Sequence, residues 1–389
     1  MKKILSLILC LAMLLSLAAC SGGNSTASGA GTTEPSQADT PSDDTPATDD
    51  GGDAEEPHFT VGILVPYASN DATFHLNNGL FMETADKNIE YILVDAGDNQ
   101  STQNDQCQTL INKGVDAIYC SPVDSDAAPT ILDICRQANI PVMIESRLPT
   151  MELWLDMINS YEHLYYFGPD IQAPGVIQAE MLLAKWNETP EWDKNGDGKI
   201  QICYVHGAIG HQNSEGRREG FYATLDASGV PYEELDYQLG AFNAATAKEI
   251  TETWIAKYGD QIEAIVSVTD AMAFGVVEAL HAAGYNNGGD NYIPVYGVNG
   301  LPEACDAITN GDMQATVYTS QIGQGKIMGQ VIYNVLTGAD PSEGVDPALS
   351  VMDENHCFYV IPTKVETPEE VAAVLLDYEE ENAYIAENG

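Results

Sequence analysis

The sequence contains few basic residues. Its 389 residues include 15 lysines and arginines against 59 aspartates and glutamates, which gives a formal net charge of -44 and an isoelectric point near 4.1. Binding to nucleic acid depends on basic side chains that neutralise phosphates. The composition therefore excludes nucleic acid as a partner.

The sequence also lacks the motifs of several common catalytic sites. It has no C-x-x-C, G-x-S-x-G or H-E-x-x-H pattern, the signatures of redox dithiols, α/β-hydrolases and zinc proteases. The residues that we expect to form a ligand pocket at the ends of the predicted strands include no pair of carboxylates of the kind that hydrolyses glycosides. We therefore expect that the protein is not an enzyme.

The apolar run at residues 4–17 is too short to span a bilayer. Lys2 and Lys3 precede it and the tetrapeptide L-A-A-C ends it at Cys20, a pattern typical of a secretory signal over residues 1–20. The small residues before Cys20 resemble the lipobox of bacterial lipoproteins, which predicts an extracytoplasmic protein held to the cell membrane by lipids on Cys20. The alternative is a secreted protein without the lipid.

Residues 21–57 contain no lysine, arginine or aromatic side chain and are rich in Gly, Ser, Thr, Pro, Ala, Asp and Glu. Such a segment cannot bury a core, and its like charges repel one another. We expect a disordered acidic linker that separates the folded part from the membrane.

Cysteine is sparse in the rest of the chain, which has Cys107, Cys120, Cys135, Cys203, Cys305 and Cys357. A chain of this length can bury a large core without disulfides. Cys120 and Cys203 fall within apolar strand patterns, where a thiol packs as a small hydrophobe. We expect buried thiols rather than a disulfide framework.

After the linker, strand and helix patterns alternate. Strands are predicted at 59–65, 90–94, 117–121, 141–145, 165–168, 201–205, 234–239, 264–268, 294–298 and 315–318, and helices at 102–112, 127–138, 173–187, 245–258, 271–283 and 322–336. A capping-box pattern at Thr367 predicts a further helix to about residue 387. This βα repetition predicts an α/β fold with parallel sheets covered on both faces, and about 330 residues favour two lobes.

The stretch D-K-N-G-D-G-K-I-Q at 193–201 has the spacing of a calcium loop. The side chains of Asp193, Asn195, Asp197 and Gln201 and the carbonyl of Lys199 fall at positions that supply oxygen ligands in EF-hands. Position twelve, however, is a tyrosine, and the following residues form a strand pattern instead of a helix. A further carboxylate must therefore come from elsewhere; the alternative is a surface turn without metal.

Polar and aromatic side chains follow the predicted strands. In an open α/β sheet these positions meet at the carboxyl edge, where ligands bind. The candidates are Asp71, Phe74, Ser121, His211, Asn213, Arg217, Phe242, Thr269, Asn299 and Thr319. Each could instead be a cap, a core residue or a solvated charge. Together they suit a neutral polyhydroxylated ligand that accepts hydrogen bonds and stacks on aromatic rings.

The chain resembles the glucose/galactose-binding proteins, type I periplasmic binding proteins that serve sugar ABC importers. The resemblance covers residues 60–362 and is carried by N-D-Q at 104–106, K-G-V at 113–115, residues 192–201, G-H at 210–211 with Arg217, D-A-M-A at 270–273, and G-V at 297–298 with L-P-E at 301–303. It implies that Glu263 supplies the missing carboxylate to a structural calcium ion. It also implies two Rossmann-like lobes, residues 58–140 with 321–354 and residues 141–320 with 355–389, joined by a three-segment hinge.

The resemblance also implies roles for the candidate pocket residues. His211 and Arg217 match side chains that hydrogen-bond the sugar, and Phe74 matches a stacking aromatic; Phe242 replaces a tryptophan. Other positions differ: Asn213 and Asn299 stand where the family has aspartates, Ser121, Thr269 and Thr319 stand where it has asparagines, and Asp71 or Ala72 replaces a further aspartate. Fewer carboxylates and shorter side chains favour a larger, less hydroxylated or substituted glycoside over free glucose or galactose.

These features predict a monomeric, lipid-anchored protein that captures a sugar or glycoside and delivers it to an ABC permease. The alternative is a lipoprotein that presents its bound state to a chemoreceptor or sensor kinase. The sequence does not separate these two functions, because both require two lobes that close around the ligand.

Overall fold

The computed structural model describes residues 57–388 except residues 70 and 290, and it leaves the side chain of Asp71 undescribed. The predicted signal peptide, Cys20 and all but the last residue of the predicted linker lie outside the described residues. The described residues belong to one compact unit. Within the described part, no helix is long and apolar enough to cross a membrane.

The first lobe is built on a seven-stranded sheet in the order β11-β12-β5-β4-β3-β1-β2. Its strands are β1 (Phe59–Val65), β2 (Ile89–Asp95), β3 (Ala117–Cys120), β4 (Val142–Glu145), β5 (Leu164–Pro169), β11 (Ser350–Met352) and β12 (Cys357–Val360). All neighbours are parallel except β11 and β12. The associated helices are α1 (Asp71–Glu83), α2 (Gln100–Lys113), α3 (Ala128–Ala138), α4 (Met151–Ser160) and α10 (Gln321–Thr337).

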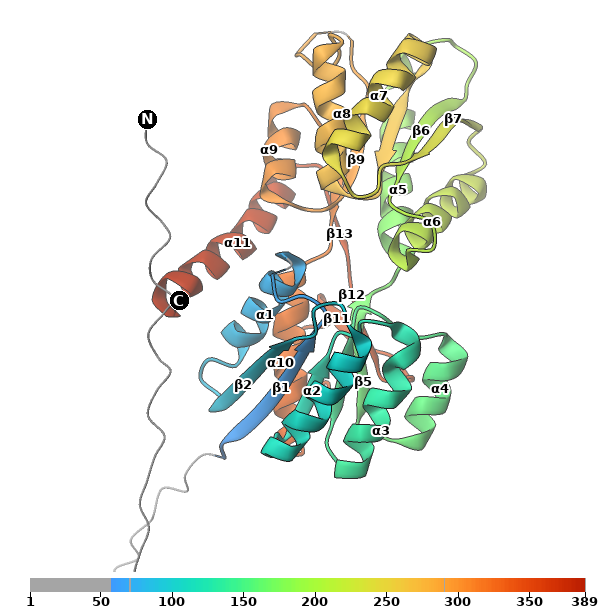
Figure 1. The fold of residues 1–389 in the computed structure, drawn as a ribbon. Coiled ribbons are helices and arrows are strands. Elements are labelled where there is room, and N and C mark those ends of the chain that lie inside the picture. Colours follow the sequence, from blue (N-terminus) through green and yellow to red (C-terminus); the bar gives the residue numbers. More distant parts are fainter. Residues whose placement is uncertain (1–56, 70, 290, 389) are drawn as a thin grey trace, which may run out of the picture. The chain divides into compact units, whose positions relative to one another are not determined.

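The second lobe is built on a six-stranded sheet in the order β13-β10-β9-β8-β6-β7 (Figure 1). Its strands are β6 (Ile200–His206), β7 (Tyr232–Leu239), β8 (Ala264–Ser267), β9 (Val295–Asn299), β10 (Ala315–Tyr318) and β13 (Thr363–Val365), of which only β13 pairs antiparallel. The helices are α5 (Ala173–Glu188), α6 (Gln212–Ser228), α7 (Ala244–Tyr258), α8 (Asp270–Ala282), α9 (Pro302–Asn310) and α11 (Pro368–Asn388).

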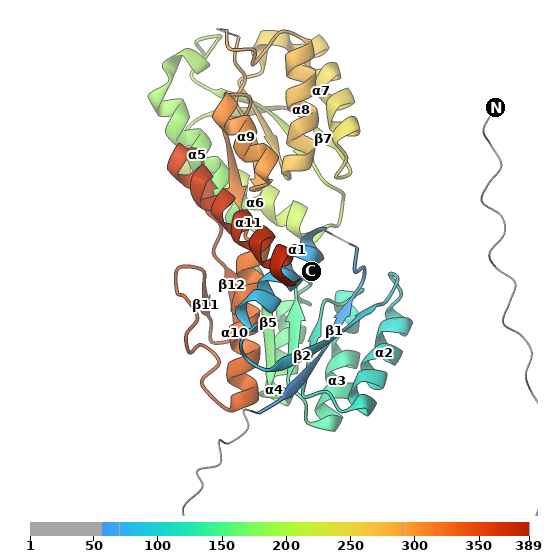
Figure 2. The same ribbon diagram turned by 90° about the vertical axis from the view of Figure 1, so that its left-hand side faces the viewer.

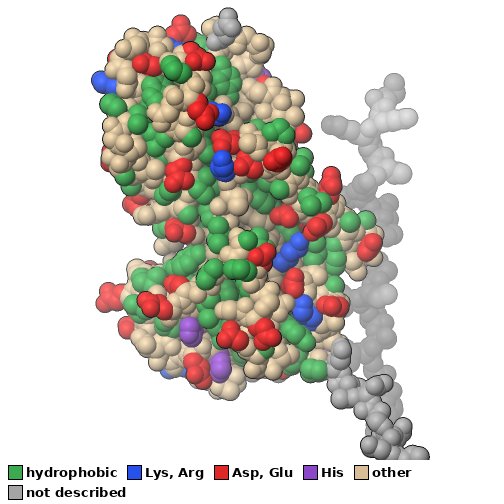
Figure 3. Space-filling view, turned by 180° about the vertical axis from the view of Figure 1, so that it is seen from behind, with side chains coloured by type: hydrophobic (Ala, Val, Ile, Leu, Met, Phe, Trp, Pro, Cys, Tyr) green, Lys and Arg blue, Asp and Glu red, His purple; other side chains and the backbone are tan. Residues whose placement is uncertain are grey.

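The central strands of both sheets are buried on both faces, as their mostly apolar sequences require, whereas the edge strands β2 and β7 are partly exposed. In the first lobe, one core cluster contains Ile118 and Trp154 and a second contains Ile63 and Met328. The second lobe has one large cluster that includes Trp254. The six cysteines of the described part are free and buried, as expected. Figure 3 shows acidic side chains spread over the visible face and few basic ones, in agreement with the charge of the chain.

The fold class is confirmed, and each predicted strand and helix is present with ends shifted by at most a few residues. The predicted helix after Thr367 is confirmed as α11. Its capping box is formed: the Thr367 N–H donates to Glu370 Oε2 at 3.0 Å, and the Glu370 N–H donates to Thr367 Oγ1 at 3.3 Å. Helices α1, α4, α6 and α9 and strands β11 to β13 are not among the predicted ranges.

The predicted lobe boundaries are corrected at two of the three crossings. The chain does not leave the first lobe near residue 140, because β4 pairs with β3 and β5 pairs with β4, so the first crossing follows Pro169. The third crossing lies near residue 361 instead of 355, because β12 pairs with β5. The crossing near Ser320, between β10 and α10, lies where it was predicted.

Candidate functional site

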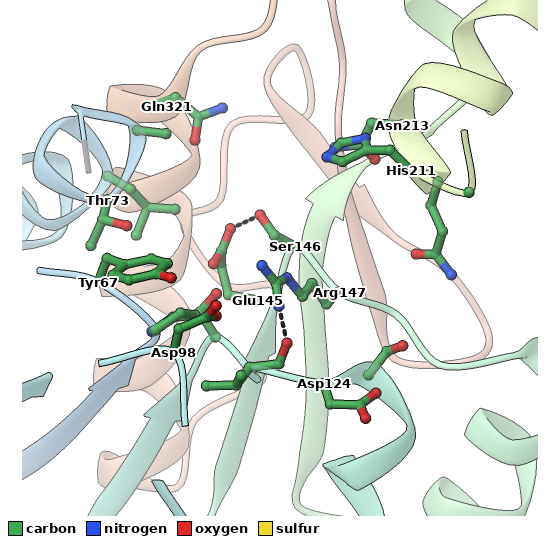
Figure 4. Close-up of a pocket in the computed structure, with 18 residues that line it drawn as sticks. Tyr67, Thr73, Asp98, Asp124, Glu145, Ser146, Arg147, His211, Asn213 and Gln321 are labelled. Carbon is green, nitrogen blue, oxygen red and sulfur yellow. Dashed lines mark hydrogen bonds between the residues drawn. The ribbon is translucent and has the colours of Figure 1, made fainter. Parts of the chain in front are cut away.

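A cavity of about 700 Å³ lies at the carboxyl ends of β1 to β4 and of β6. The first lobe contributes Pro66, Tyr67, Ala72, Thr73, Leu76, Asp98, Ser121, Val123, Asp124, Ser125, Glu145, Ser146, Arg147 and Gln321, and the second lobe contributes Gly210, His211, Gln212 and Asn213. The site therefore occupies the place where ligands bind in open α/β sheets. Figure 4 shows these side chains around the cavity.

The end of β4 supplies a charged part of the wall. Glu145 is 6% exposed, and its Oε1 accepts hydrogen bonds from Gln324 Nε2, at 3.1 Å, and from Ser146 Oγ. Burial raises the pKa of Glu145 to about 7, although its hydrogen bonds and Arg147 oppose the shift. Arg147 donates to the carbonyl of Val123 and lies close to Glu145 (Figure 4).

Tyr67, in the segment between β1 and α1, provides an aromatic ring in the cavity. A hydrogen bond to the Asp98 carboxylate is the main cause that raises the pKa of its hydroxyl. Aromatic rings of this kind stack on the C–H faces of sugars. Tyr67 can therefore provide the stacking surface that the sequence prediction assigned to Phe74.

The second lobe presents the start of α6. The His211 ring lies 4.8 Å from the Phe242 ring in an edge-to-face arrangement, and its Nδ1 is 3.4 Å from Ser214 Oγ. Burial and the nearby arginines lower the pKa of His211, so the ring is neutral at pH 7 and can both donate and accept a hydrogen bond.

Three of the predicted ligand-binding residues line the cavity: Ser121, His211 and Asn213. Phe242 contacts His211 but does not line the cavity. Phe74 is 48% exposed, and its ring packs edge-on against His75. The side chain of Asp71 lies outside the described residues.

The remaining predicted ligand-binding residues have structural partners or lie deeper in the second lobe. Arg217 is 8% exposed and donates to the carbonyl of Val268. Thr269 caps α8 through the Met272 N–H, and Asn299 ends β9 with a φ of 132°. Thr319 is buried, and its hydroxyl has no hydrogen-bond partner among the described residues. These four residues do not line the cavity, to which the described part of the second lobe contributes only residues 210–213.

The sequence prediction missed most of the first-lobe wall. Tyr67, Asp98, Asp124, Ser146 and Arg147 all follow strands that were predicted correctly. The same rule that selected Ser121 after β3 would have selected Ser146 and Arg147 after β4. It would likewise have selected Tyr67 after β1, Asp98 after β2 and Asp124 after β3.

The loop between α5 and β6 forms tight turns held by its own side-chain oxygens. Gly196 and Gly198 have φ values of 72° and 74°, which permit its tight turns. Its side-chain oxygens converge on the loop backbone: the Asp197 N–H donates to Asp193 Oδ1 at 3.1 Å and to Asn195 Oδ1 at 2.8 Å. Asp193 Oδ2 accepts from the Gly198 N–H at 3.0 Å.

Glu263 lies against this loop, as the family resemblance implied. Its two carboxylate oxygens accept the N–H groups of Lys194, at 2.8 Å, and Gln201, at 3.0 Å. Gln201 directs Nε2 toward Asp197 Oδ2 at 2.9 Å and leaves its buried Oε1 without a partner in the described part. Turning this amide over would direct the unpartnered oxygen toward the loop.

The donor set consists of hard oxygen ligands, which suit calcium. In the described conformation, however, no group of three or more His, Cys, Asp or Glu side chains is close enough to hold a metal ion. Glu263 and the loop aspartates would therefore have to turn inward around a cation. Their identities and the orphaned oxygen of Gln201 fit a calcium ion.

Comparison with known proteins agrees with this architecture. Residues 61–340 match the model of the periplasmic binding protein domain. The D-galactose/methyl-galactoside binding periplasmic protein of Haemophilus influenzae is 36% identical over 257 residues, which cover 66% of this chain and 75% of that protein. The ribose import binding protein of Bacillus subtilis is 25% identical over 90% of this chain and 99% of its own length.

Solved structures share the fold. A solute-binding protein of an ABC transporter from Bacillus halodurans, with bound myo-inositol, superimposes with a TM-score of 0.63 at 23% identity over 84% of this chain and all of that chain. The arabinose-binding component from a Shewanella species, bound to L-arabinofuranose, gives 0.63 at 24% identity over 84% of this chain and 97% of its own. The expectation of a binding protein instead of an enzyme is confirmed by these relatives, and the chain belongs to the periplasmic binding protein family.

Proposed function

We propose that the chain captures a sugar or glycoside between its two lobes and delivers it, chemically unchanged, to an ABC importer. The observation that carries this proposal is the cavity: donors, acceptors and the Tyr67 ring of the first lobe face His211 and Asn213 of the second. Relatives that bind galactosides and ribose support the ligand class.

The charges of the lining narrow the ligand class. Among the described residues of the lining, Asp98 and Asp124 supply two carboxylates and Glu145 a carboxyl group with a pKa of about 7. Arg147 is the one cationic side chain among them, since His211 is neutral at pH 7. An anionic ligand such as a sugar phosphate would meet net repulsion. We therefore propose a ligand without negative charge.

A binding screen tests this function. We expect D-galactose, methyl galactoside, D-ribose, xylitol or myo-inositol to raise the melting temperature and to show saturable heat in calorimetry, and mass spectrometry to recover the bound compound unaltered. Galactose 6-phosphate serves as the charged control. Binding of the phosphate alone, or recovery of an altered sugar, would contradict the proposal.

Arg217 is proposed to hydrogen-bond the ligand when the lobes close. The guanidinium is buried, burial lowers its pKa to about 10, and Val268 O is its one hydrogen-bond acceptor in the described part, so donor capacity remains. Arg217→Ala should weaken binding of the compound found in the screen about 10- to 100-fold, since a hydrogen bond to a charged group contributes about 1.5–3 kcal/mol. Isothermal calorimetry measures the loss.

The neighbouring Arg218 provides the control for Arg217. Arg218 pairs with Glu234 at 2.6 Å and lies over the rings of Tyr222 and Tyr237, away from the cavity lining. Arg218→Ala should lower stability but leave the affinity within about twofold. Equal affinities of the Arg217→Ala variant and the unchanged protein would remove Arg217 from the site.

We further propose that residues 193–201 and Glu263 hold a structural calcium ion, and that lipids on Cys20 hold the protein at the cell membrane. The loop conformation, the hard oxygen donors and the position of Glu263 support the first proposal. The lipobox pattern in the sequence supports the second. Release of a Cys20→Ser variant from the membrane fraction would test the anchor.

A further inference from the structure

The C-terminal helix α11 lies outside the segment that matches the family model, which ends at residue 340. By chain order it belongs to the second lobe, since it follows β13. Figures 1 and 2 both show it running from beside α9 to beside α1 of the first lobe. Its contacts therefore bear on how the two lobes are held together.

The first half of α11 is fixed to the second lobe. Val371 and Val374 are buried in one apolar cluster with Cys305 of α9, Tyr318 of β10 and Val365 of β13. Helix positions three apart lie on the same face, so the two valines form one continuous contact. Burial of this face anchors the helix to the second lobe.

The middle of α11 contacts the crossing between the lobes. Asp377 Oδ2 accepts hydrogen bonds from the hydroxyl of Tyr318, at 2.8 Å, and from Oγ of Ser320, at 3.2 Å. Ser320 also caps α10 through the Gly323 N–H at 2.8 Å. Asp377 thus joins α11 to the residue at which the chain passes into the first lobe.

The last part of α11 contacts the first lobe. Glu381 is 2% exposed, and its carboxylate accepts from His75 Nδ1, at 2.7 and 2.9 Å to its two oxygens, and from Asn78 Nδ2 at 2.8 Å. Tyr378 packs edge-on against His75, with ring centres 5.4 Å apart, and Glu380 pairs with Lys326 of α10 at 3.0 Å.

Both residues that donate hydrogen bonds to Glu381 belong to a helix that lines the ligand cavity. His75 and Asn78 lie on α1, which contributes Ala72, Thr73 and Leu76 to the wall. A buried carboxylate loses its hydrogen bonds at a high free-energy cost if its partners move away. A change in the angle between the lobes must therefore break this contact or carry α1 along with α11.

We propose that α11 is a strap between the lobes: its valines fix it to the second lobe, and Glu381 holds α1 of the first lobe, so that the strap limits the range of lobe angles and positions the α1 wall of the cavity. The limit on lobe angles does not depend on the identity of the ligand. The positioning of the cavity wall rests on the proposed function.

Glu381→Gln tests the strap, because glutamine keeps the size of the side chain but removes its charge. The experiment uses the full chain carrying Cys20→Ser. Spin labels are attached at two exposed positions, Thr130→Cys on α3 and Ala223→Cys on α6, and they report the distance between the lobes. Without any sugar, we expect the distance distribution to become at least about twofold broader than in the parent. Glu379→Gln, at an exposed position on the same helix, is the matched control and should leave it unchanged.

Asn78→Ala removes a hydrogen bond of the same contact from the side of the first lobe. This variant should also broaden the distribution of distances between the spin labels. Melting temperatures of all variants show whether each remains folded under the conditions of measurement. Unchanged distributions in both folded variants would overturn the strap. Adding methyl galactoside and the other screened sugars separates the two hypotheses. If no sugar changes the distance distribution of the parent, the result counts against the proposed function. Broadening of the distribution in the variants without ligand would still support the strap.

Discussion

Chelation of calcium is expected to lower the free energy of unfolding by about 4 kcal/mol. The reference is protein in a free calcium concentration about a thousand times the dissociation constant of the site. The reason is that the ligands come together only in the folded chain: Glu263 is distant in sequence from the 193–201 loop and reaches it through the sheet. Without a cation, Glu263 and the loop aspartates repel one another; burial is the largest cause that raises the pKa of Glu263, and Asp193 and Asp197 add to it.

Denaturant unfolding with and without chelator measures this difference, with the metal content of both samples determined. Glu263→Gln should unfold at the same denaturant concentration in both conditions. Glu191→Gln, an exposed neighbour of the loop, should retain the full calcium effect. Equal stability of loaded and metal-free parent protein would eliminate the structural calcium ion.

The strands and the loop conformation could be predicted because their causes are local. Residues of β3, β4 and β8 are buried along their whole length and therefore appear in the sequence as short runs that are mostly apolar. Gly196 and Gly198 occur where the loop backbone needs positive φ. Such features are present in a few consecutive residues, so they need no knowledge of the rest of the fold.

Helix α1 could not be predicted, because packing overrides its local preferences. Its middle, Asn77-Asn78-Gly79, consists of weak helix formers. Gly79 is required by close approach to α10, since a Cβ there would lie 2.0 Å from the carbonyl oxygen of Ile322. Asn78 is held by Glu381, more than three hundred residues later.

The lobe boundaries and half of the candidate site depend on which strands are neighbours. Both lobes repeat the same βα unit, so the pattern at 141–145 fits either sheet, and only the pairing of β4 with β3 assigns it to the first. That pairing also places Glu145, Ser146 and Arg147 in the cavity. The sequence prediction located the carboxyl edge correctly after β3 and β6, where Ser121 and His211 lie.

Glu145 should make the protein less stable as the pH rises. Burial raises the pKa of its carboxyl group from 4.5 to about 7 in the folded chain, so the folded state keeps a proton that the unfolded state releases. The stabilisation from this proton is complete below pH 4.5 and is lost as the pH rises through 7. Its size is about 3 kcal/mol, from 1.36 kcal/mol per pKa unit.

Glu145→Gln removes this dependence, because the amide is neutral at every pH. Relative to the parent, the variant should gain about 3 kcal/mol of stability between pH 4.5 and pH 8, measured by urea unfolding at a series of pH values. Glu152→Gln, an exposed position on α4, is the control for removing one negative charge and should follow the parent. A constant stability difference between the Glu145 variant and the parent across this range would contradict the shift.

The same proton provides an independent test of the cavity. If ligand hydroxyls donate hydrogen bonds to Glu145, they favour its ionised form, and binding near pH 7 should release a fraction of a proton. Calorimetry in buffers of different ionisation enthalpy measures that release. Glu145→Gln should abolish it, whereas binding that occurs elsewhere would leave the buffer dependence of the parent and the variant identical.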